Sequence, residues 1–398
     1  LINNWEATYF DFNNKKIKEI AKESSKLGIE LFVLDDGWFG ERNNDDCSLG
    51  DWFVNEEKLK GGLNSLATDI NKMGMQFGLW FEPEMISPKS KLYEEHPDWC
   101  IHIDGRIRSE ARKQLILDLS RDEVCEAVIK MITDVLKSAP ISYVKWDMNR
   151  NMTEIGSTAW PAKKQKEIAH RYMLGLYKIL ENITSNFPNI LFESCSGGGG
   201  RFDGGMLYYM PQTWTSDDTD AIERLMIQEG TSLVYPTSSM GSHVSAVPNH
   251  QVHRITPLNT RGVVAMAGSF GYELDVTKMN EEEKEEVKKQ VEFYKNIRST
   301  VQFGDLYRLK SSFDSNEAAW MNLSKDGKEV VVSYVKKYAE ANVIPRRLKV
   351  KALDENSLYE VIETGEVFGG DELMYIGLEI GELMGDYQAK NWTLRKVD

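Results

Sequence analysis

Short apolar segments, each followed by an acidic residue, recur along the chain and constrain its fold more than any other feature. Such segments are typical of strands that are buried on both faces of a parallel sheet. Amphipathic stretches lie between them, for example residues 123–137 and 168–184, and these predict helices. The alternation predicts a parallel sheet covered by helices. The segments and the acids that follow them are residues 29–34 (Asp35, Asp36), 77–81 (Glu82), 115–117 (Asp118), 143–144 (Asp147), 190–192 (Glu193) and 213–215 (Asp217).

The predicted strands number about eight, which favours a closed barrel. Residues 8–12 are rich in β-formers and are expected to be the first strand. Residues 233–242 and 261–274 compete for the last strand. An open, doubly wound sheet is the alternative, but no Gly-x-Gly-x-x-Gly run follows a strand and the acidic strand ends are spread over the whole chain. We therefore expect a (β/α)8 (TIM) barrel.

The pattern changes after about residue 303. Asn280 can cap a helix over residues 281–297, and alternating runs then follow at 329–334 and 347–351, separated by Asp, Gly and Asn turns. These runs predict a small antiparallel β-sandwich domain. The expected fold class is α/β, with a (β/α)8 barrel over 1–302 and a C-terminal antiparallel β domain over 303–398.

Charge and composition exclude several function classes. The net charge of −14 argues against a nucleic-acid partner, because phosphate binding requires a basic surface. No run of 18 apolar residues is present, so no transmembrane helix is expected, and the first residues do not predict a signal peptide. The four cysteines show neither metal nor disulfide spacing, which favours a reducing, cytoplasmic location. A neutral small molecule is the expected ligand.

Asp147 ends the run Tyr143-Val144-Lys145-Trp146-Asp147 and is the candidate nucleophile. In a parallel barrel, active sites lie at the C-terminal ends of the strands. A carboxylate there can stabilise the cation-like transition state of glycoside cleavage and form a covalent glycosyl-enzyme. Lys145 points to the same side of the strand and would keep Asp147 ionised. A structural ion pair at the strand end is an equally good interpretation.

Asp217 is the candidate acid/base, because a leaving oxygen needs a proton. Burial or the nearby charge of Asp147 could raise the pKa of Asp217 so that it is protonated at rest. The neighbours Asp218 and Asp220 make this choice ambiguous, since one member of the triplet could instead cap the helix that begins at Ala221.

Asp35 and Asp36 form a paired-carboxylate strand end that suits the hydroxyl groups of a sugar. A divalent metal site is the alternative, but no calcium-loop spacing supports it. The run from Cys195 to Arg201 contains four consecutive glycines, which allow the backbone to approach a sugar ring closely or to turn tightly. The ending of a phosphate-binding loop is absent from this run.

Six segments in one order together resemble the bacterial α-galactosidases of glycoside hydrolase family 36. They are Asn3–Asp11, Asp35–Phe39, Gly78–Glu84, Lys145–Arg150, Cys195–Arg201 and Trp214–Asp220. The resemblance implies a retaining enzyme that removes terminal α-1,6-galactose from melibiose, raffinose and related oligosaccharides, without a cofactor or metal. A galactosyl transferase of the raffinose-synthase type and a non-catalytic galactose-binding barrel are the alternatives.

The resemblance also implies roles for individual residues. It places the nucleophile on Asp147 and the acid/base on Asp217. Similar enzymes carry a β-sandwich domain before the barrel that helps to build a tetramer, so whether this chain forms a homo-oligomer is left open. The residues implied in galactose binding are Asp35, Asp36, Trp80, Arg112, Lys145, Asn149, Cys195 and Gly198, with Trp5 near the entrance.

Overall fold

The computed structural model describes residues 1–397, and its eight parallel strands form a closed barrel in the order β1-β10-β9-β8-β7-β6-β3-β2. The expected barrel is therefore confirmed. The barrel strands are β1 (Ile2–Asn3), β2 (Leu31–Leu34), β3 (Gln76–Phe81), β6 (Tyr143–Trp146), β7 (Leu191–Ser194), β8 (Gln212–Trp214), β9 (Met240–Ser245) and β10 (Ser269–Glu273).

The chain divides into two compact units. The first comprises Leu1–Trp214 and Leu274–Lys278, and the second comprises Thr215–Glu273 and the chain from Met279 onward. Six barrel strands lie in the first unit, whereas β9 and β10 share the second unit with the C-terminal sheet.

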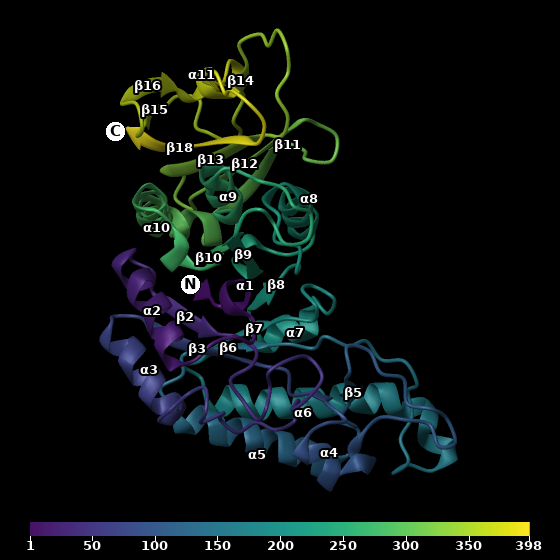
Figure 1. Cartoon of the computed structure of the whole chain (residues 1–398). Helices are drawn as coiled ribbons and strands as arrows, with labels where there is room; N and C mark the ends of the chain where they lie inside the picture. Colours follow the sequence, from purple (N-terminus) through teal and green to yellow (C-terminus); the bar gives the residue numbers. More distant parts are fainter. Residues whose placement is uncertain (398) are drawn as a thin grey trace. The chain divides into compact units, whose positions relative to one another are not determined.

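Amphipathic helices accompany the strands of the first unit. In α2, the Asn13 side chain accepts hydrogen bonds from the first turn, and Ile17, Ile20 and Ala21 form the buried face. Helices α5 and α6 lie side by side (Figure 1). The helices of this unit are α1 (Trp5–Thr8), α2 (Asn14–Lys26), α3 (Gly62–Lys72), α4 (Lys91–Glu95), α5 (Asp122–Ser138), α6 (Ile168–Asn186) and α7 (Gly204–Tyr209), with 3-10 turns at Pro97–Trp99, Ala162–Glu167 and Val276–Lys278.

Two predicted barrel strands are wrong. Residues 8–12 contain no strand, because Thr8 is the last residue of α1. The Asn4 carbonyl accepts the backbone N–H groups of Ala7 and Thr8, and Tyr9 ends the turn at a positive φ of 45°. The first barrel strand is instead β1, at residues 2–3. Residues 115–117 do contain a strand, β5 (Leu115–Ile116), but it pairs antiparallel with β4 (Met85–Ile86) outside the barrel.

The two segments that compete for the last strand, 233–242 and 261–274, each contribute to a barrel strand, so the barrel has eight strands as predicted. β9 and β10 pair in parallel, with Gly241 opposite Ser269. Helix α9 (Leu258–Ala265) occupies the start of the second candidate segment, and helix α8 (Ala221–Ser232) precedes β9. A 3-10 turn at Thr237–Ser239 leads into β9.

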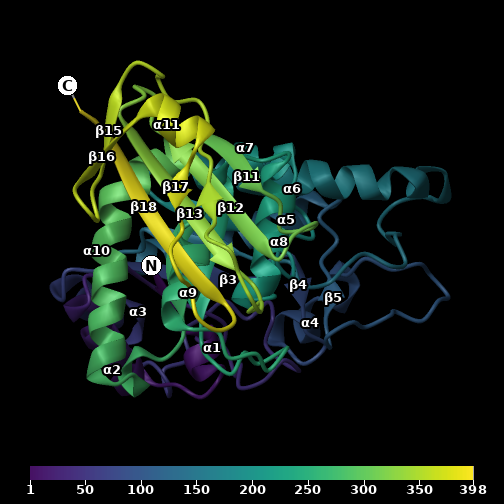
Figure 2. The ribbon, with the colours of Figure 1, turned by 90° about the horizontal axis from the view of Figure 1, so that it is seen from above.

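The C-terminal region is an antiparallel β domain, as expected. Its six-stranded sheet has the order β11-β12-β13-β18-β15-β16, and Figure 2 shows β12, β13 and β18 side by side. A two-stranded sheet, β14-β17, shares one apolar core with it, which includes Val332, Leu348, Leu378 and Trp392. The strands are β11 (Asp305–Lys310), β12 (Glu317–Leu323), β13 (Glu329–Lys336), β14 (Arg347–Leu348), β15 (Leu358–Val361), β16 (Glu366–Gly369), β17 (Leu378–Glu379) and β18 (Gln388–Val397).

Two helices complete the second unit. The long helix α10 (Glu281–Phe303) begins with a capping box in which Asn280 and Glu283 each accept a hydrogen bond from the other's backbone N–H. Helix α11 (Gly370–Tyr375) precedes β17.

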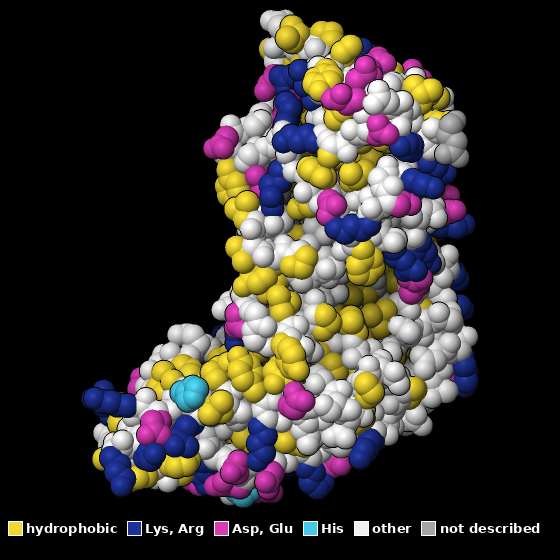
Figure 3. Space-filling model, turned by 180° about the vertical axis from the view of Figure 1, so that it is seen from behind, with side chains coloured by type: hydrophobic (Ala, Val, Ile, Leu, Met, Phe, Trp, Pro, Cys, Tyr) yellow, Lys and Arg dark blue, Asp and Glu magenta, His cyan; other side chains and the backbone are white. Residues whose placement is uncertain are grey.

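The surface carries charges of both signs. On the face seen in Figure 3, Lys and Arg side chains are interspersed with Asp and Glu side chains. None of the helices within residues 1–397 combines the length and the apolar character that a bilayer crossing requires.

Candidate active site

Asp147 follows β6 directly and is buried, with 5% of its surface exposed. Its backbone N–H donates to the Phe81 carbonyl at 2.8 Å, which extends the β3–β6 pairing by one residue. Four donors hold its carboxylate. Oδ2 accepts from Trp80 Nε1 at 3.2 Å and from Asn149 Nδ2 at 2.8 Å, while Oδ1 accepts from the backbone N–H groups of Met148 at 2.8 Å and Gly197 at 3.4 Å. These contacts fix the orientation of the carboxylate, as a nucleophile requires.

The indole of Trp80 lies between the nucleophile candidate and an aromatic cluster. Its ring stacks near Phe39, with centroids 6.2 Å apart, and Trp52 and Trp38 complete the cluster. The Trp80 carbonyl accepts from Trp38 Nε1 at 2.9 Å. Packing against these rings restricts the rotamer of Trp80 and so fixes the donor to Asp147.

Lys145 forms its ion pair with Asp35, at 3.0 Å, and both side chains are buried. Asp35 Oδ2 also accepts from Asn3 Nδ2 at 2.6 Å, and the Asp35 backbone N–H donates to Asn4 Oδ1 at 2.8 Å. The strand ends of β1, β2 and β6 are thereby connected. A carboxylate can accept about four hydrogen bonds, so Asp35 retains capacity for a sugar hydroxyl.

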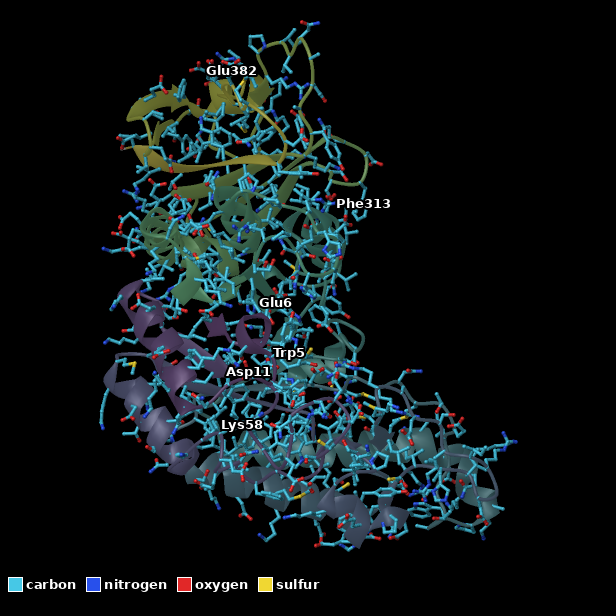
Figure 4. All side chains as sticks on the ribbon, viewed as in Figure 1. Trp5, Glu6, Asp11, Lys58, Phe313 and Glu382 are labelled. Atoms are coloured by element: carbon cyan, nitrogen blue, oxygen red, sulfur yellow. The ribbon has the colours of Figure 1, made fainter. Side chains whose placement is uncertain are left out.

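Asp36 forms a forked contact with Arg42, whose Nε lies 3.0 Å and Nη2 2.8 Å from the carboxylate. Burial raises the pKa of Asp36 above its ordinary value, and the Arg42 charge opposes that shift. Lys58, which is labelled in Figure 4, supports the same region, because its ammonium donates to the carbonyls of Phe10, Gly37 and Arg42. Arg42 and Lys58 were not predicted, since an isolated basic residue in a loop leaves no periodic signal.

The glycine run forms a tight turn against Asp147. Gly197 and Gly198 both have positive φ, and the Gly197 N–H also donates to Asn149 Oδ1 at 3.2 Å. A Cβ at Gly200 would lie 2.6 Å from the Ser196 carbonyl oxygen. Cys195 is buried and lies at the start of the turn. The run thus forms the predicted tight turn and contacts the segment that contains Asp147 and Asn149, while its predicted approach to a sugar ring stays a prediction.

Two buried glutamates after β3 extend this network, and neither was predicted as a site residue. Glu84 accepts a forked contact from Arg201 at 2.7 and 2.8 Å, and also accepts from Tyr172 and Trp146. This contact anchors the end of the glycine turn beside β6. Glu82 accepts the Asn149 backbone N–H at 2.5 Å. Both acids follow a predicted strand, but their partners come from segments distant in sequence.

Trp5 and Arg112 lie at the periphery of these contacts. Trp5 belongs to α1, is half-buried, and makes edge contacts with Tyr9 and Phe10 at centroid distances of 5.1 and 5.2 Å; its position is labelled in Figure 4. Arg112 is exposed, has a φ of 53°, and lies 3.9 Å from Asp45. The galactose-binding roles of both residues stay predictions.

The segment after β8 belongs to the second unit, and its aspartates have different surroundings. Asp220 caps α8 by accepting the N–H groups of Ile222 and Glu223, and Asp218 accepts the Asp220 N–H at 3.0 Å. Asp217 is exposed and is therefore not in the buried environment that was predicted as one possibility. Of Asp217, Asp218 and Asp220, Asp220 therefore caps the helix and Asp218 stabilises the turn before it.

Arg224 fixes the backbone of this segment. It is almost fully buried, and its guanidinium donates to the carbonyls of Asp218 at 2.8 Å and Ser216 at 2.6 Å and to Thr215 Oγ1 at 2.5 Å. Asp217 therefore lies between two carbonyls fixed by one cation.

The residues described, 1–397, contain no group of three or more His, Cys, Asp or Glu side chains arranged to hold a metal ion. Asp35 and Asp36 are instead paired with Lys145 and Arg42.

The chain forms a closed parallel barrel with buried carboxylates at the C-terminal ends of its strands. In barrels of this class, ligands bind at that end. Within that class, residues 1–304 match the Melibiase family and residues 317–394 match the glycosyl hydrolase family 36 C-terminal domain. The chain belongs to the Melibiase family, and the resemblance to glycoside hydrolase family 36 is confirmed.

Similar proteins cover the whole chain. It is 62% identical to alpha-galactosidase AgaA of Geobacillus stearothermophilus and 52% identical to alpha-galactosidase Mel36A of Lactobacillus acidophilus, in each case over 100% of this chain and 54% of the relative. The crystal structure of AgaA superposes with a TM-score of 0.98 and is covered to 55%. Variants of AgaA have been solved in complex with raffinose and with stachyose. The chain thus spans about half the length of these relatives.

Proposed function

We propose that this chain is the catalytic part of an α-galactosidase that cleaves terminal α-1,6-galactosyl residues with retention of configuration. The observation that carries the proposal is the buried, four-donor carboxylate of Asp147 at the end of β6, in a member of the Melibiase family. Melibiose and raffinose-type oligosaccharides are the proposed substrates, which agrees with the raffinose and stachyose complexes of AgaA variants.

In the first step, Asp147 attacks the anomeric carbon of the galactosyl unit while Asp217 donates its proton to the glycosidic oxygen. The bond from the anomeric carbon to the leaving oxygen breaks, and a galactosyl ester forms on Asp147. In the second step, Asp217, now a carboxylate, removes a proton from water, and the water oxygen attacks the anomeric carbon. The electron pair of the ester bond returns to Asp147, and two inversions give net retention.

We assign recognition of galactose to the strand ends around Asp147. Asp35 and Asp36 would accept hydrogen bonds from sugar hydroxyls, and their ion pairs with Lys145 and Arg42 pre-orient them. Asn149 and the turn at Cys195 and Gly198 would contact the ring beside the nucleophile. Trp80 offers an apolar face for the C–H groups of the sugar.

Replacing each acid tests the assignment. Asp147→Ala should lower turnover by about 10⁴-fold or more, because covalent catalysis disappears, and azide or formate should partly restore cleavage of an activated aryl galactoside. Asp217→Ala should slow cleavage of raffinose far more than that of the activated substrate, since a good leaving group needs no proton.

Asp218→Asn is the matched control, because the amide oxygen can still accept the Asp220 N–H. We expect activity within a few-fold of the parent. Unchanged hydrolysis by Asp147→Ala would refute the proposal, and transfer of galactose to added sucrose instead of to water would favour a transferase.

A further inference from the structure

Glu82 is a buried acid beside the proposed nucleophile, and the mechanism above does not use it. It directly follows β3 and is fully buried. One carboxyl oxygen accepts the Asn149 N–H at 2.5 Å, and the other lies 3.2 Å from Gln114 Nε2. Because the Asp147 N–H donates to the Phe81 carbonyl, the backbones of Glu82 and Asp147 are fixed side by side.

The contact with Asn149 connects Glu82 to the nucleophile. The Asn149 side chain donates to Asp147 Oδ2 at 2.8 Å and accepts the Gly197 N–H at 3.2 Å. Glu82 therefore holds a residue that contacts both Asp147 and the glycine turn. Displacing Asn149 would remove a hydrogen-bond donor from the nucleophile.

Glu82 and Asp147 cannot both be ionised without cost in a buried site. Burial, and then the charge of Asp147, raise the pKa of Glu82 to about 8, while the Asn149 N–H, Arg42 and Arg112 oppose the shift. The charged groups that face Glu82 are thus Asp147 after β6, Arg42 after β2 and Arg112 before β5. Near neutral pH Glu82 carries its proton in the resting protein.

The side chain of Gln114 can accept a hydrogen bond from the protonated carboxyl group of Glu82. It is fully buried, and its Oε1 has no hydrogen-bond partner among the described residues. Exchanging the positions of the amide oxygen and nitrogen, which are interchangeable in shape, would put Oε1 in place to accept the Glu82 hydroxyl. The orphaned acceptor is explained if Glu82 is the donor.

We propose that Glu82 is a positioning residue that acts as a neutral acid and holds Asn149 against Asp147. Because Glu82 is neutral, Asp147 is the only anion of the Glu82–Asp147 pair when the galactosyl ester breaks. This inference rests on the proposed function of Asp147. When the ester breaks, its electron pair returns to Asp147 as a full negative charge. An ionised Glu82 would oppose that step by repulsion, and a neutral one does not.

The breakdown step can be measured alone. Galactosyl-enzyme is prepared with 5-fluoro-α-galactosyl fluoride, excess reagent is removed, and recovery of activity is followed between pH 5 and 9.5. In this step Asp217 acts as a carboxylate base, so its ionisation causes no loss at high pH. We expect the parent to recover about fivefold to tenfold more slowly at pH 9 than at its optimum. The midpoint should lie below 8, because the ester removes the charge of Asp147.

Glu82→Gln should lack this alkaline loss, because the amide stays neutral at every pH and can still accept the Asn149 N–H. Glu82→Ala should recover slowly at all pH values, because the contact with Asn149 is lost, and Glu82→Gln should restore most of that loss. Glu317→Gln is the matched control, since it changes a buried glutamate of the C-terminal sheet that contacts Tyr334 and Arg346. It should keep the parent's profile.

Identical alkaline profiles for the parent and Glu82→Gln would overturn the inference and leave the proposed function intact. If no galactosyl-enzyme forms while α-galactosides are still hydrolysed, the proposed function itself fails. Circular dichroism at each pH separates both results from unfolding.

Discussion

At the scale of single residues, buried ion pairs at the strand ends should be important for stability as well as for binding. Asp36→Ala leaves Arg42, whose side chain is 1% exposed, as an uncompensated buried charge. We expect the free energy of unfolding to fall by about 3 kcal/mol. Asp45 also approaches Arg42, at 3.5 Å, but is 46% exposed, so Asp45→Ala should cost less than about 1 kcal/mol. Equal losses in denaturant titrations would contradict this account of the pair.

The raised pKa of Glu82 also predicts how stability depends on pH. The unfolded chain releases this proton near the ordinary glutamate value, about 4.3, whereas the folded protein keeps it until about 8. Between these values the folded state binds more protons, so this residue lowers the free energy of unfolding as pH rises. Relative to the parent, Glu82→Gln should therefore gain stability from about pH 4.5 to 8, by up to about 1.4 kcal/mol per pH unit.

Thermal or denaturant unfolding of both proteins across this range measures the difference. A parallel pair of stability curves would show that Glu82 ionises normally in the folded protein.

Much of the arrangement around Asp147 could be predicted from the sequence. Asp35 and Asp147 each follow a recognisable strand, Lys145 lies near the end of one, and parallel strands bring their C-terminal ends together. Arg42 and Arg224 could not be predicted, because each acts through backbone carbonyls or a carboxylate that only the folded chain brings near. The ion pair of Lys145 with Asp35, rather than with Asp147, likewise depends on side-chain geometry that spacing does not encode.

At the scale of elements, the packing of α6 against the segment before α5 depends on a glycine. A Cβ at Gly175 would lie 1.8 Å from the Leu119 carbonyl oxygen and 3.0 Å from Cys125 Sγ. Gly175→Ala should therefore destabilise the protein by about 3 kcal/mol, because helix or backbone must shift.

Gly230 in α8 is the matched control. A Cβ there meets only Phe313 Cζ, at 3.7 Å, so Gly230→Ala should be neutral or stabilising by up to about 1 kcal/mol. Comparable losses for both variants in unfolding experiments would contradict the packing argument.

Helices were predicted more accurately than the first and fourth strands. Helix α10 has a capping box and an apolar stripe, and both signals are local. Residues 115–117 have the composition of a barrel strand, but β5 pairs antiparallel with β4, a choice made by tertiary contacts. Residues 8–12 have β-forming side chains, yet Thr8 ends a helical turn and residues 9–12 form no strand. Composition identifies strand-forming segments and does not assign their partners.

At the scale of the whole molecule, the C-terminal sheet and the last barrel elements share one apolar cluster. Leu225 of α8 and Val264 of α9 pack with Ala318, Val335 and Ala389 of the sheet. The predicted boundary at 302/303 would cut through this cluster. We therefore expect a chain ending at residue 302 to expose these apolar surfaces and to aggregate or bind a hydrophobic dye. A truncated chain that elutes as a monomer and unfolds cooperatively would show that 1–302 is an independent domain.

The central claim is that Asp147 becomes covalently bound to galactose during turnover. The most direct measurement is tandem mass spectrometry of the protein after reaction with 5-fluoro-α-galactosyl fluoride. We predict one fluorogalactosyl group per chain, carried by Asp147 in the peptide that contains Lys145 and Asn149, and none after Asp147→Ala. A label on a different carboxylate, or hydrolysis that proceeds with inversion and no label, would contradict the account.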